Sequence, residues 1–303
     1  MCTGSSRGFI VVGVDDEPES INAAIYAIDQ ARALGLCVRL VHAFGSLIGY
    51  GQYAALKIGR LERAAHALVD RVSARLDMPE GVCLERTIDS GSPVDALVDA
   101  CDEARFVVIG RREKHRAPRL VRGHLASRLS ARAPDPVITV PAAWRQPEHA
   151  DERVVIGLDA MTPSRRPLTF AFTQAEAMGA GLTVLHAFAH EGERASTDHG
   201  ASAVSEALAP LRARFPDVAV EVGLVRDRAD EMLIAASADA SLLVVGKPYE
   251  YAGFGAWLGS SSATVLRHAD CPVAVVPQAC ADAPVQSSKP ETRHRSPQVQ
   301  GVE

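Results

Sequence analysis

Residues Ser241 to Pro277 read SLLVVGKPYEYAGFGAWLGSSSATVLRHADCPVAVVP, and this stretch decides the fold. The apolar run Leu242 to Val245 is short, rich in β-branched residues and followed by Gly246, which is typical of a strand buried on both faces of a parallel sheet. Gly259 and the three serines after it precede an apolar segment, and this pattern predicts the start of a helix. Because a helix N-terminus offers N–H groups and the positive end of a dipole, the stretch predicts one side of a phosphate-binding pocket.

A second copy of the stretch supports this interpretation, because a glycine and a serine before a helix are by themselves an ordinary cap. Residues Arg105 to Pro141 read RFVVIGRREKHRAPRLVRGHLASRLSARAPDPVITVP, and their landmarks lie 136 positions before the counterparts in the later stretch. The pairs are Gly110 and Gly246, Gly123 and Gly259, Pro136 and Pro272, and Pro141 and Pro277. So regular a register predicts two copies of one unit.

The earlier parts of the two copies also correspond. An apolar run ends at Asp15, and a second ends at Asp159, which lies 144 positions later; His42 and His186 keep the same offset. In each copy, runs typical of buried strands alternate with amphipathic helical segments, which implies a parallel sheet wound on both faces. The predicted fold class is α/β, with two tandem Rossmann-like domains, each a five-stranded parallel sheet with helices on both faces.

The predicted organisation is two domains over residues 1–143 and 144–278, followed by a disordered tail over 279–303. A chain of 303 residues with 47% hydrophobic residues is long enough for two cores of about 150 residues each. The last strands of the two copies, Val137 to Val140 and Val273 to Val276, are expected at sheet edges. There the halves would cover each other's edges around a pseudo-twofold axis.

Composition limits the partners. The net charge of −5 and the pI near 6.1 argue against nucleic acid or an anionic membrane surface as the main partner. The six cysteines show neither CxxC nor zinc-ligand spacing, so we expect reduced thiols. No apolar run approaches the roughly 18 residues of a membrane span, and no signal-peptide pattern opens the chain, so we expect a cytoplasmic protein.

The two glycine stretches and the strand-end aspartates resemble the universal stress protein family, over roughly residues 9 to 277. The ATP-binding members of that family carry G-x2-G-x9-G-[ST] after the fourth strand and an Asp at the end of the first strand. The four motif positions hold Gly246, Tyr249, Gly259 and Ser260 in the second half, and Gly110, Glu113, Gly123 and His124 in the first. The spacing is kept in both halves, the middle glycine is replaced in both, and the final Ser/Thr is replaced only in the first.

The resemblance implies an adenine nucleotide alpha hydrolase-like fold that binds an adenine nucleotide, with ATP, with or without Mg²⁺, as the expected ligand and a homodimer as the expected assembly. The aspartates would meet the ribose or adenine, the alanines would flank the base, and the glycines and serines would hold phosphates. The implied residues are Asp15, Ala43, Gly110 and Gly123 in the first half, and Asp159, Ala187, Gly246, Gly259, Ser260 and Ser261 in the second. If only one half binds, we expect the second, because His124 puts a ring where Ser260 offers a hydroxyl.

A basic loop leaves an alternative open for the first half. Six basic residues lie between Arg111 and Arg122, against the single acid Glu113. Their side chains either pair with phosphates and compensate for the missing glycine, or form a solvated loop.

Other chemistry is less well supported. Gly259 to Ala263 nearly matches the GxSxG nucleophile elbow, but the strand before it ends about a dozen residues earlier. His186 and His190 straddle a strand end and make a poor metal pair; the repeated histidines are expected to pack at the strand ends. Asp15 and Asp16 could hold a cation, although acids at a helix start are the simpler interpretation.

The sequence leaves three functions open. The first is a stress-response regulatory protein that binds an adenine nucleotide without catalysis. The second is an interaction scaffold that has lost the ligand, and the third is a weak ATPase. No evident catalytic base stands where a γ-phosphate would lie, so we expect no substantial ATP turnover.

Overall fold

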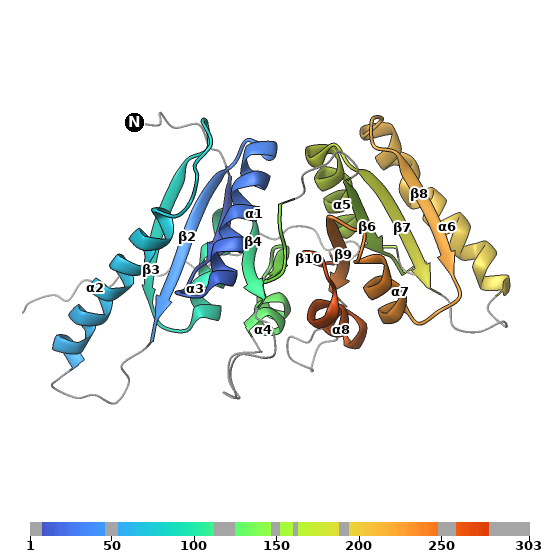
Figure 1. The fold of residues 1–303 in the computed structure, drawn as a ribbon. Coiled ribbons are helices and arrows are strands. Elements are labelled where there is room, and N and C mark those ends of the chain that lie inside the picture. Colours follow the sequence, from blue (N-terminus) through green and yellow to red (C-terminus); the bar gives the residue numbers. More distant parts are fainter. Residues whose placement is uncertain are drawn as a thin grey trace, which may run out of the picture.

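A computed structural model describes residues 8–45, 54–111, 125–146, 152–159, 163–187, 194–247 and 259–278. We call residues 8–146 the first half and residues 152–278 the second half. In each half, strands and helices alternate along the chain (Figure 1).

The first half contains five strands, four α-helices and one 3-10 turn within its described residues. They are β1 (Phe9–Gly13), α1 (Pro18–Leu34), β2 (Cys37–Phe44), α2 (Ala54–Ser73), β3 (Leu84–Ser90), α3 (Pro93–Asp99), η2 (Ala100–Glu103), β4 (Ala104–Arg111), α4 (Leu125–Arg132) and β5 (Val137–Pro141).

The second half repeats this order over its described residues. Its elements are β6 (Arg153–Gly157), α5 (Arg165–Met178), β7 (Gly181–Ala187), α6 (Arg194–Arg214), β8 (Val220–Val225), α7 (Ala229–Ala236), β9 (Leu242–Lys247), α8 (Ser260–His268) and β10 (Val273–Pro277).

Local sequence explains where the first helix of each half ends. Gly35 follows α1 with φ 66°, and Gly179 follows α5 with φ 64°; in both, the left-handed backbone suits glycine and closes the helix. At its other end α1 begins with Pro18, whose missing N–H is not needed at that position. None of the described helices is both long and apolar enough to cross a membrane.

All strands form one ten-stranded sheet in the order β3-β2-β1-β4-β5-β10-β9-β6-β7-β8. Within each half every pairing is parallel, whereas β5 and β10 pair antiparallel, with Ile138 opposite Ala274. The prediction that these two strands are the edges through which the halves meet is therefore confirmed. Their pairing satisfies backbone groups that two separate sheets would leave open.

The core is continuous on one face of the sheet and divided on the other. On the first face, residues of α1, α2, α5 and α6 pack against strands of both halves in a single apolar cluster, for example Phe106 and Phe172. On the opposite face, α3 and α4 cover one cluster in the first half, and α7 and α8 cover another in the second. The strands are therefore buried on both faces, which explains their unbroken apolar runs.

The structure corrects the expectation that the cysteines are all reduced. Cys37, the first residue of β2, and Cys83, just before β3, form a disulfide with their Cα atoms 4.8 Å apart. The parallel pairing of β2 and β3 brings them together, since the Val38 N–H donates to the Cys83 carbonyl at 2.8 Å. Cys101 and Cys271 are free and buried, as expected of core thiols.

Candidate functional site

Two cavities lie at matching places, one in each half. In the first half, β1 lies between β2 and β4, and the chain reverses its order across the sheet at the pair β1 and β4; in the second half β6 and β9 form the equivalent pair. Ligands of open α/β sheets bind beyond the carboxyl ends of the strands at such a reversal. Each cavity opens there, between the ends of β1 and β4 or of β6 and β9.

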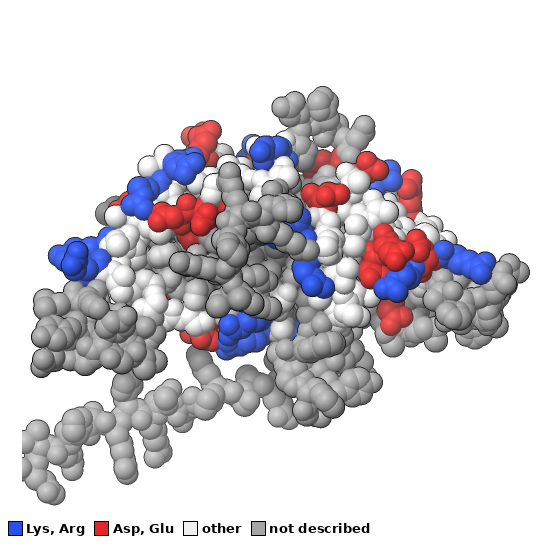
Figure 2. All heavy atoms as spheres, turned by 60° about the horizontal axis from the view of Figure 1, so that its bottom comes forward, with Lys and Arg blue, Asp and Glu red and all other residues white. Residues whose placement is uncertain are grey.

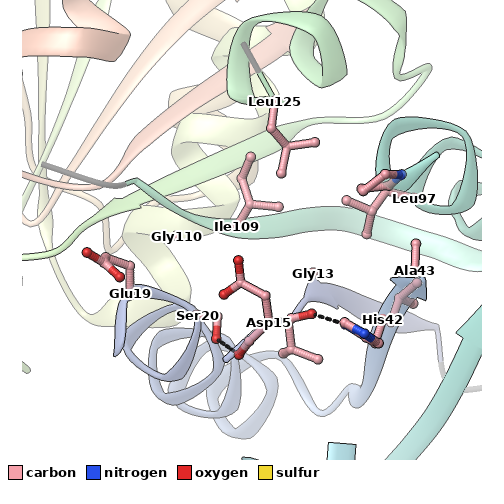
Figure 3. A pocket seen from close by; sticks show the side chains of 13 residues that line it. Gly13, Asp15, Glu19, Ser20, His42, Ala43, Leu97, Ile109, Gly110 and Leu125 are labelled. Atoms are coloured by element: carbon pink, nitrogen blue, oxygen red, sulfur yellow. Dashed lines mark hydrogen bonds between the residues drawn. The ribbon is translucent and has the colours of Figure 1, made fainter. Parts of the chain in front are cut away.

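The first cavity has a volume of about 120 Å³. Figure 3 shows Asp15 and Gly110 close to its middle, Glu19 near Gly110 on one side, and His42 and Ala43 on the other. The lining residues that matter below are Asp15, Glu19, His42, Ala43, Gly110 and Leu125. Three of the four site residues predicted for this half therefore line one cavity, while Gly123 lies outside the described residues.

The second cavity is larger, with a volume of about 280 Å³. The lining residues that matter below are Asp159, His186, Ala187, Gly246, Ser261 and Gln278. Four of the six site residues predicted for this half thus share a cavity. Gly259 and Ser260 are not among its lining residues but lie at the start of α8, directly before Ser261.

A histidine fixes the loop that carries the aspartate in each half. Nδ1 of His42 lies 2.8 Å from the carbonyl oxygen of Val14, and Nδ1 of His186 lies 3.0 Å from that of Leu158. In both halves this carbonyl belongs to the residue directly before the strand-end aspartate. The prediction that the repeated histidines pack at the strand ends is confirmed, and each ring contacts the residue directly before the aspartate.

The first aspartate is held further by α1. Its Oδ1 accepts the backbone N–H of Glu17 at 3.1 Å, and its carbonyl accepts the Ser20 hydroxyl at 2.8 Å. The hydroxyl contact is drawn in Figure 3. An acid at a helix start is the simpler of the two interpretations of Asp15, and these contacts fit it.

The start of α8 gives the second cavity its polar end. Gly259 is the N-cap, and its carbonyl accepts the Ala263 N–H at 2.8 Å. Ser261 lines the cavity, and the hydroxyl of Ser262 donates to the Gly246 carbonyl at 3.2 Å. The sequence pattern missed Ser262, although helical spacing from the cap could have indicated which hydroxyls face the strand end.

The matching position in the first half is apolar. Leu125 lies 136 positions before Ser261 and lines the first cavity, as Figure 3 shows. Ala126 stands where Ser262 stands in the second half, and it packs against the apolar cores instead of reaching a strand end. The end of the first cavity next to α4 therefore lacks both hydroxyls found in the second half.

Basic residues after the motif glycines cross from one half to the other. The Arg111 guanidinium donates to the carbonyls of Leu266, at 3.1 Å, and Ala269 near the end of α8. Lys247, 136 positions later, donates through Nζ to the Ala131 carbonyl near the end of α4. Each cation thus lies at the negative end of the other half's helix dipole.

Arg111 is also the first of the six basic residues in the loop from Arg111 to Arg122. The two terminal guanidinium nitrogens of Arg111 donate to the second half, so Arg111 follows neither of the two alternatives, a phosphate partner or a solvated loop. The other five basic residues of the loop, Arg112, Lys114, Arg116, Arg119 and Arg122, lie outside the described residues.

Lys247→Met is expected to lower the free energy of unfolding by about 1–3 kcal/mol, because it leaves the buried Ala131 carbonyl without this donor. Lys247 is only 8% exposed, and methionine keeps most of its apolar stem in place. Urea unfolding of the full chain measures the change. Arg267→Met, which removes an exposed contact to Ala263, serves as the control and should cost less than about 0.5 kcal/mol. Equal costs for the two variants would contradict the crossed arrangement.

The described free thiols are poor nucleophiles. Burial raises the pKa of the Cys101 thiol to about 12 and that of the Cys271 thiol to about 12. Thiolates attack, thiols do not, so neither residue supplies thiol chemistry near neutral pH. Within the described part of the chain, no group of three or more His, Cys, Asp or Glu side chains is placed to hold a metal ion.

Figure 2 turns the carboxyl ends of the strands toward the viewer. On this face the described Lys and Arg side chains are interspersed with Asp and Glu side chains over both halves. The face as a whole has no single sign of charge among these residues. Selection of a charged ligand therefore depends on the individual side chains in each cavity.

Known proteins resemble this chain in sequence and in fold. The sequence model of the universal stress protein family matches residues 8–141 and 152–277. A universal stress protein of Mycolicibacterium smegmatis is 28% identical over 282 residues, covering 88% of this chain and 96% of that protein. One of Mycobacterium tuberculosis (strain ATCC 25618 / H37Rv) is 27% identical over 296 residues, covering 91% and 98%. The crystal structure of a universal stress protein from Archaeoglobus fulgidus DSM 4304 has the same fold, with a TM-score of 0.67 at 15% identity over 90% of this chain and 97% of that one.

Proposed function

The chain belongs to the universal stress protein family, and from this premise we propose that its second half binds an adenine nucleotide, ATP being the expected ligand, without turning it over. The observation that carries the proposal is the second cavity. It joins Asp159, two residues after β6, with Gly246, the last residue but one of β9, and Ser261, in the first turn of α8. A carboxylate and a helix N-terminus then face one space from different elements.

Each end of this cavity suits a different part of a nucleotide. The Asp159 carboxylate accepts hydrogen bonds from ribose hydroxyls, and Ala187 leaves room for a base beside it. At the other end, the Ser261 hydroxyl and the first N–H groups of α8 donate to phosphate oxygens, and the helix dipole favours their charge. Ser262 bonds the Gly246 carbonyl and so ties α8 to the strand end that it faces.

The same residues give little support to catalysis. Asp159 is the single carboxylate among the described lining residues of the second cavity, and His186 uses Nδ1 toward the Leu158 carbonyl. One carboxylate does not form a metal site, so Mg²⁺ would enter only with the phosphates that carry it. Donors without a base or a metal clamp bind phosphates but do little to activate water.

Ser261→Asp tests the proposal. Calorimetric titration of the full chain with ATP should show binding weakened on the order of a hundredfold or more, because a carboxylate then lies beside the phosphates. An acid in the first turn of a helix does not destabilise it, so lost binding would not reflect unfolding.

The control is Leu125→Asp, which places the same carboxylate at the matching position of the other half. It should leave ATP binding within about twofold, because its charge lies in the other cavity. Mass spectrometry of small molecules released from freshly purified protein would identify the resident nucleotide. Absence of ATP binding by the unmodified chain would overturn the proposal and favour an interaction scaffold.

A cytoplasmic location and a homodimer are the remaining parts of the proposal. In the described sheet β3 and β8 are the outermost strands, and on β8 Val222 and Leu224 are 44% and 42% exposed. Sedimentation of the full chain would test the assembly. The Cys37–Cys83 disulfide bears on the location, since cytosolic thiols are usually kept reduced; thiol labelling in cells would measure its state.

A further inference from the structure

We propose that the first cavity binds an uncharged nucleoside and excludes the phosphorylated form. The two cavities share the end where the base and sugar would lie, because Gly13, Asp15, His42 and Ala43 each have the same residue 144 positions later. This inference depends on the proposed function in one respect only, namely that the base is adenine. What separates the two cavities is the end where phosphates would lie.

The first difference is a loss of donors. In the second cavity Ser261 supplies a hydroxyl, and Ser262 bonds the Gly246 carbonyl. Leu125 and Ala126 occupy these positions in the first half, and Leu125 lines the cavity. An apolar side chain placed against a phosphate removes its water without replacing the hydrogen bonds, which disfavours the charged group.

The second difference is an added negative charge. Glu19 lines the first cavity, whereas Pro163 stands at the matching position 144 residues later. Among the described residues, Oε2 of Glu19 is buried and has no hydrogen-bond partner. The negative charge of this carboxylate, beside the cavity, repels a phosphate.

Backbone packing brings this acid close to the strand end. The carbonyl group of Glu19 lies against Gly110, so close that a Cβ on Gly110 would overlap it. The backbone of α1 therefore fills the space beside Gly110. Figure 3 shows the Glu19 side chain near Gly110. In the second half the side-chain amide of Gln278, which can donate, lies beside Gly246 instead.

The direction of the Arg111 side chain and the volume of the first cavity also disfavour a phosphate there. Arg111, the one residue of the basic loop within the described part of the chain, donates to the carbonyls of Leu266 and Ala269 in the other half and not toward the first cavity. The first cavity, at about 120 Å³, is less than half the volume of the second, at about 280 Å³. One chain would then hold a nucleotide in its second half and a dephosphorylated nucleoside in its first.

Equilibrium dialysis of the full chain with labelled adenosine, AMP and ATP tests the inference. Ala43→Trp fills the first cavity and Ala187→Trp fills the second, at matching positions. The Ala187→Trp chain should bind adenosine at least about tenfold more tightly than AMP, and adding Ala43→Trp to that chain should abolish its adenosine binding. Thermal melting checks that both variants fold, and Ala43→Leu and Ala187→Leu replace any variant that does not.

The double change Glu19→Gln with Leu125→Ser, made in the Ala187→Trp chain, should narrow the gap between adenosine and AMP by about tenfold, because it removes the acid and restores a hydroxyl. AMP binding as tight as adenosine binding before this change, or no adenosine binding at all, would overturn the inference. Failure of the proposed function would look different, since it would appear as loss of ATP binding in the Ala43→Trp chain.

Discussion

Gly110→Ala is expected to lower the free energy of unfolding by about 2–4 kcal/mol, while Gly246→Ala, at the matching position, should cost less than about 1 kcal/mol. A Cβ on Gly110 would overlap the carbonyl carbon and oxygen of Glu19, which are backbone atoms in the first turn of α1. These atoms move only if the helix moves. A Cβ on Gly246 meets the end of the Gln278 side chain, which can rotate away.

Chemical unfolding of the two variants measures the difference, and the pair is its own control because the substitution and the strand position are the same. If both variants lost about 2–4 kcal/mol of unfolding free energy, the Gln278 side chain would be held as firmly as backbone atoms are. If neither variant lost stability, α1 would move away from the new Cβ without a cost in free energy. Gly110, which matches a ligand-binding motif in the sequence, is thus needed for the packing of α1 against β4. In the second half no backbone of the described residues packs against Gly246 in this way, so a ligand can approach Gly246 closely.

The sequence predicts the two cavities because their residues follow strand ends. Asp15 lies two residues after β1, and Gly110 is the last residue but one of β4. Parallel strands that neighbour each other end at one edge of the sheet, so a repeated register is enough to place the two residues together. The pairing of β5 with β10 could be predicted for a similar reason, since a short apolar strand at a sheet edge needs a partner.

Contacts that depend on side-chain direction were not predictable in this way. Glu19 follows Asp15 by four residues in an ordinary helical turn, and no motif distinguishes it from a solvated acid. Arg111 belongs to a run of basic residues that suggests a phosphate, yet its guanidinium reaches the end of α8 in the other half. Such contacts depend on how the halves dock, which a repeat within one chain does not reveal.

Cysteine spacing was equally uninformative. Cys37 and Cys83 are separated by 46 positions, and no spacing rule links residues so far apart. They meet because each lies at the start of its strand, or just before it, and β2 pairs with β3. The register of the strands, and not the motif, decides whether two cysteines can bond.

Loss of this disulfide gives the second large expected effect. Cys83→Ser should lower the free energy of unfolding by about 4 kcal/mol relative to the oxidised chain, because a bond across 46 residues restricts the unfolded chain strongly. Cys83 is the better residue to change, since Cys37 is 6% exposed and a serine there would bury a hydroxyl. Urea unfolding with and without reductant measures the change.

The second half offers the matched comparison for this bond. Gly181 and Ala219 occupy the positions of Cys37 and Cys83, and the Leu182 N–H donates to the Ala219 carbonyl at 2.8 Å, as the Val38 N–H does to Cys83. The backbone frame is therefore the same without the bond. Reduced wild-type protein should unfold like Cys83→Ser, and reductant should not affect that variant. If oxidised and reduced wild-type chains were equally stable, the pairing of β2 with β3 alone would hold this edge of the sheet, as that of β7 with β8 does at the other edge.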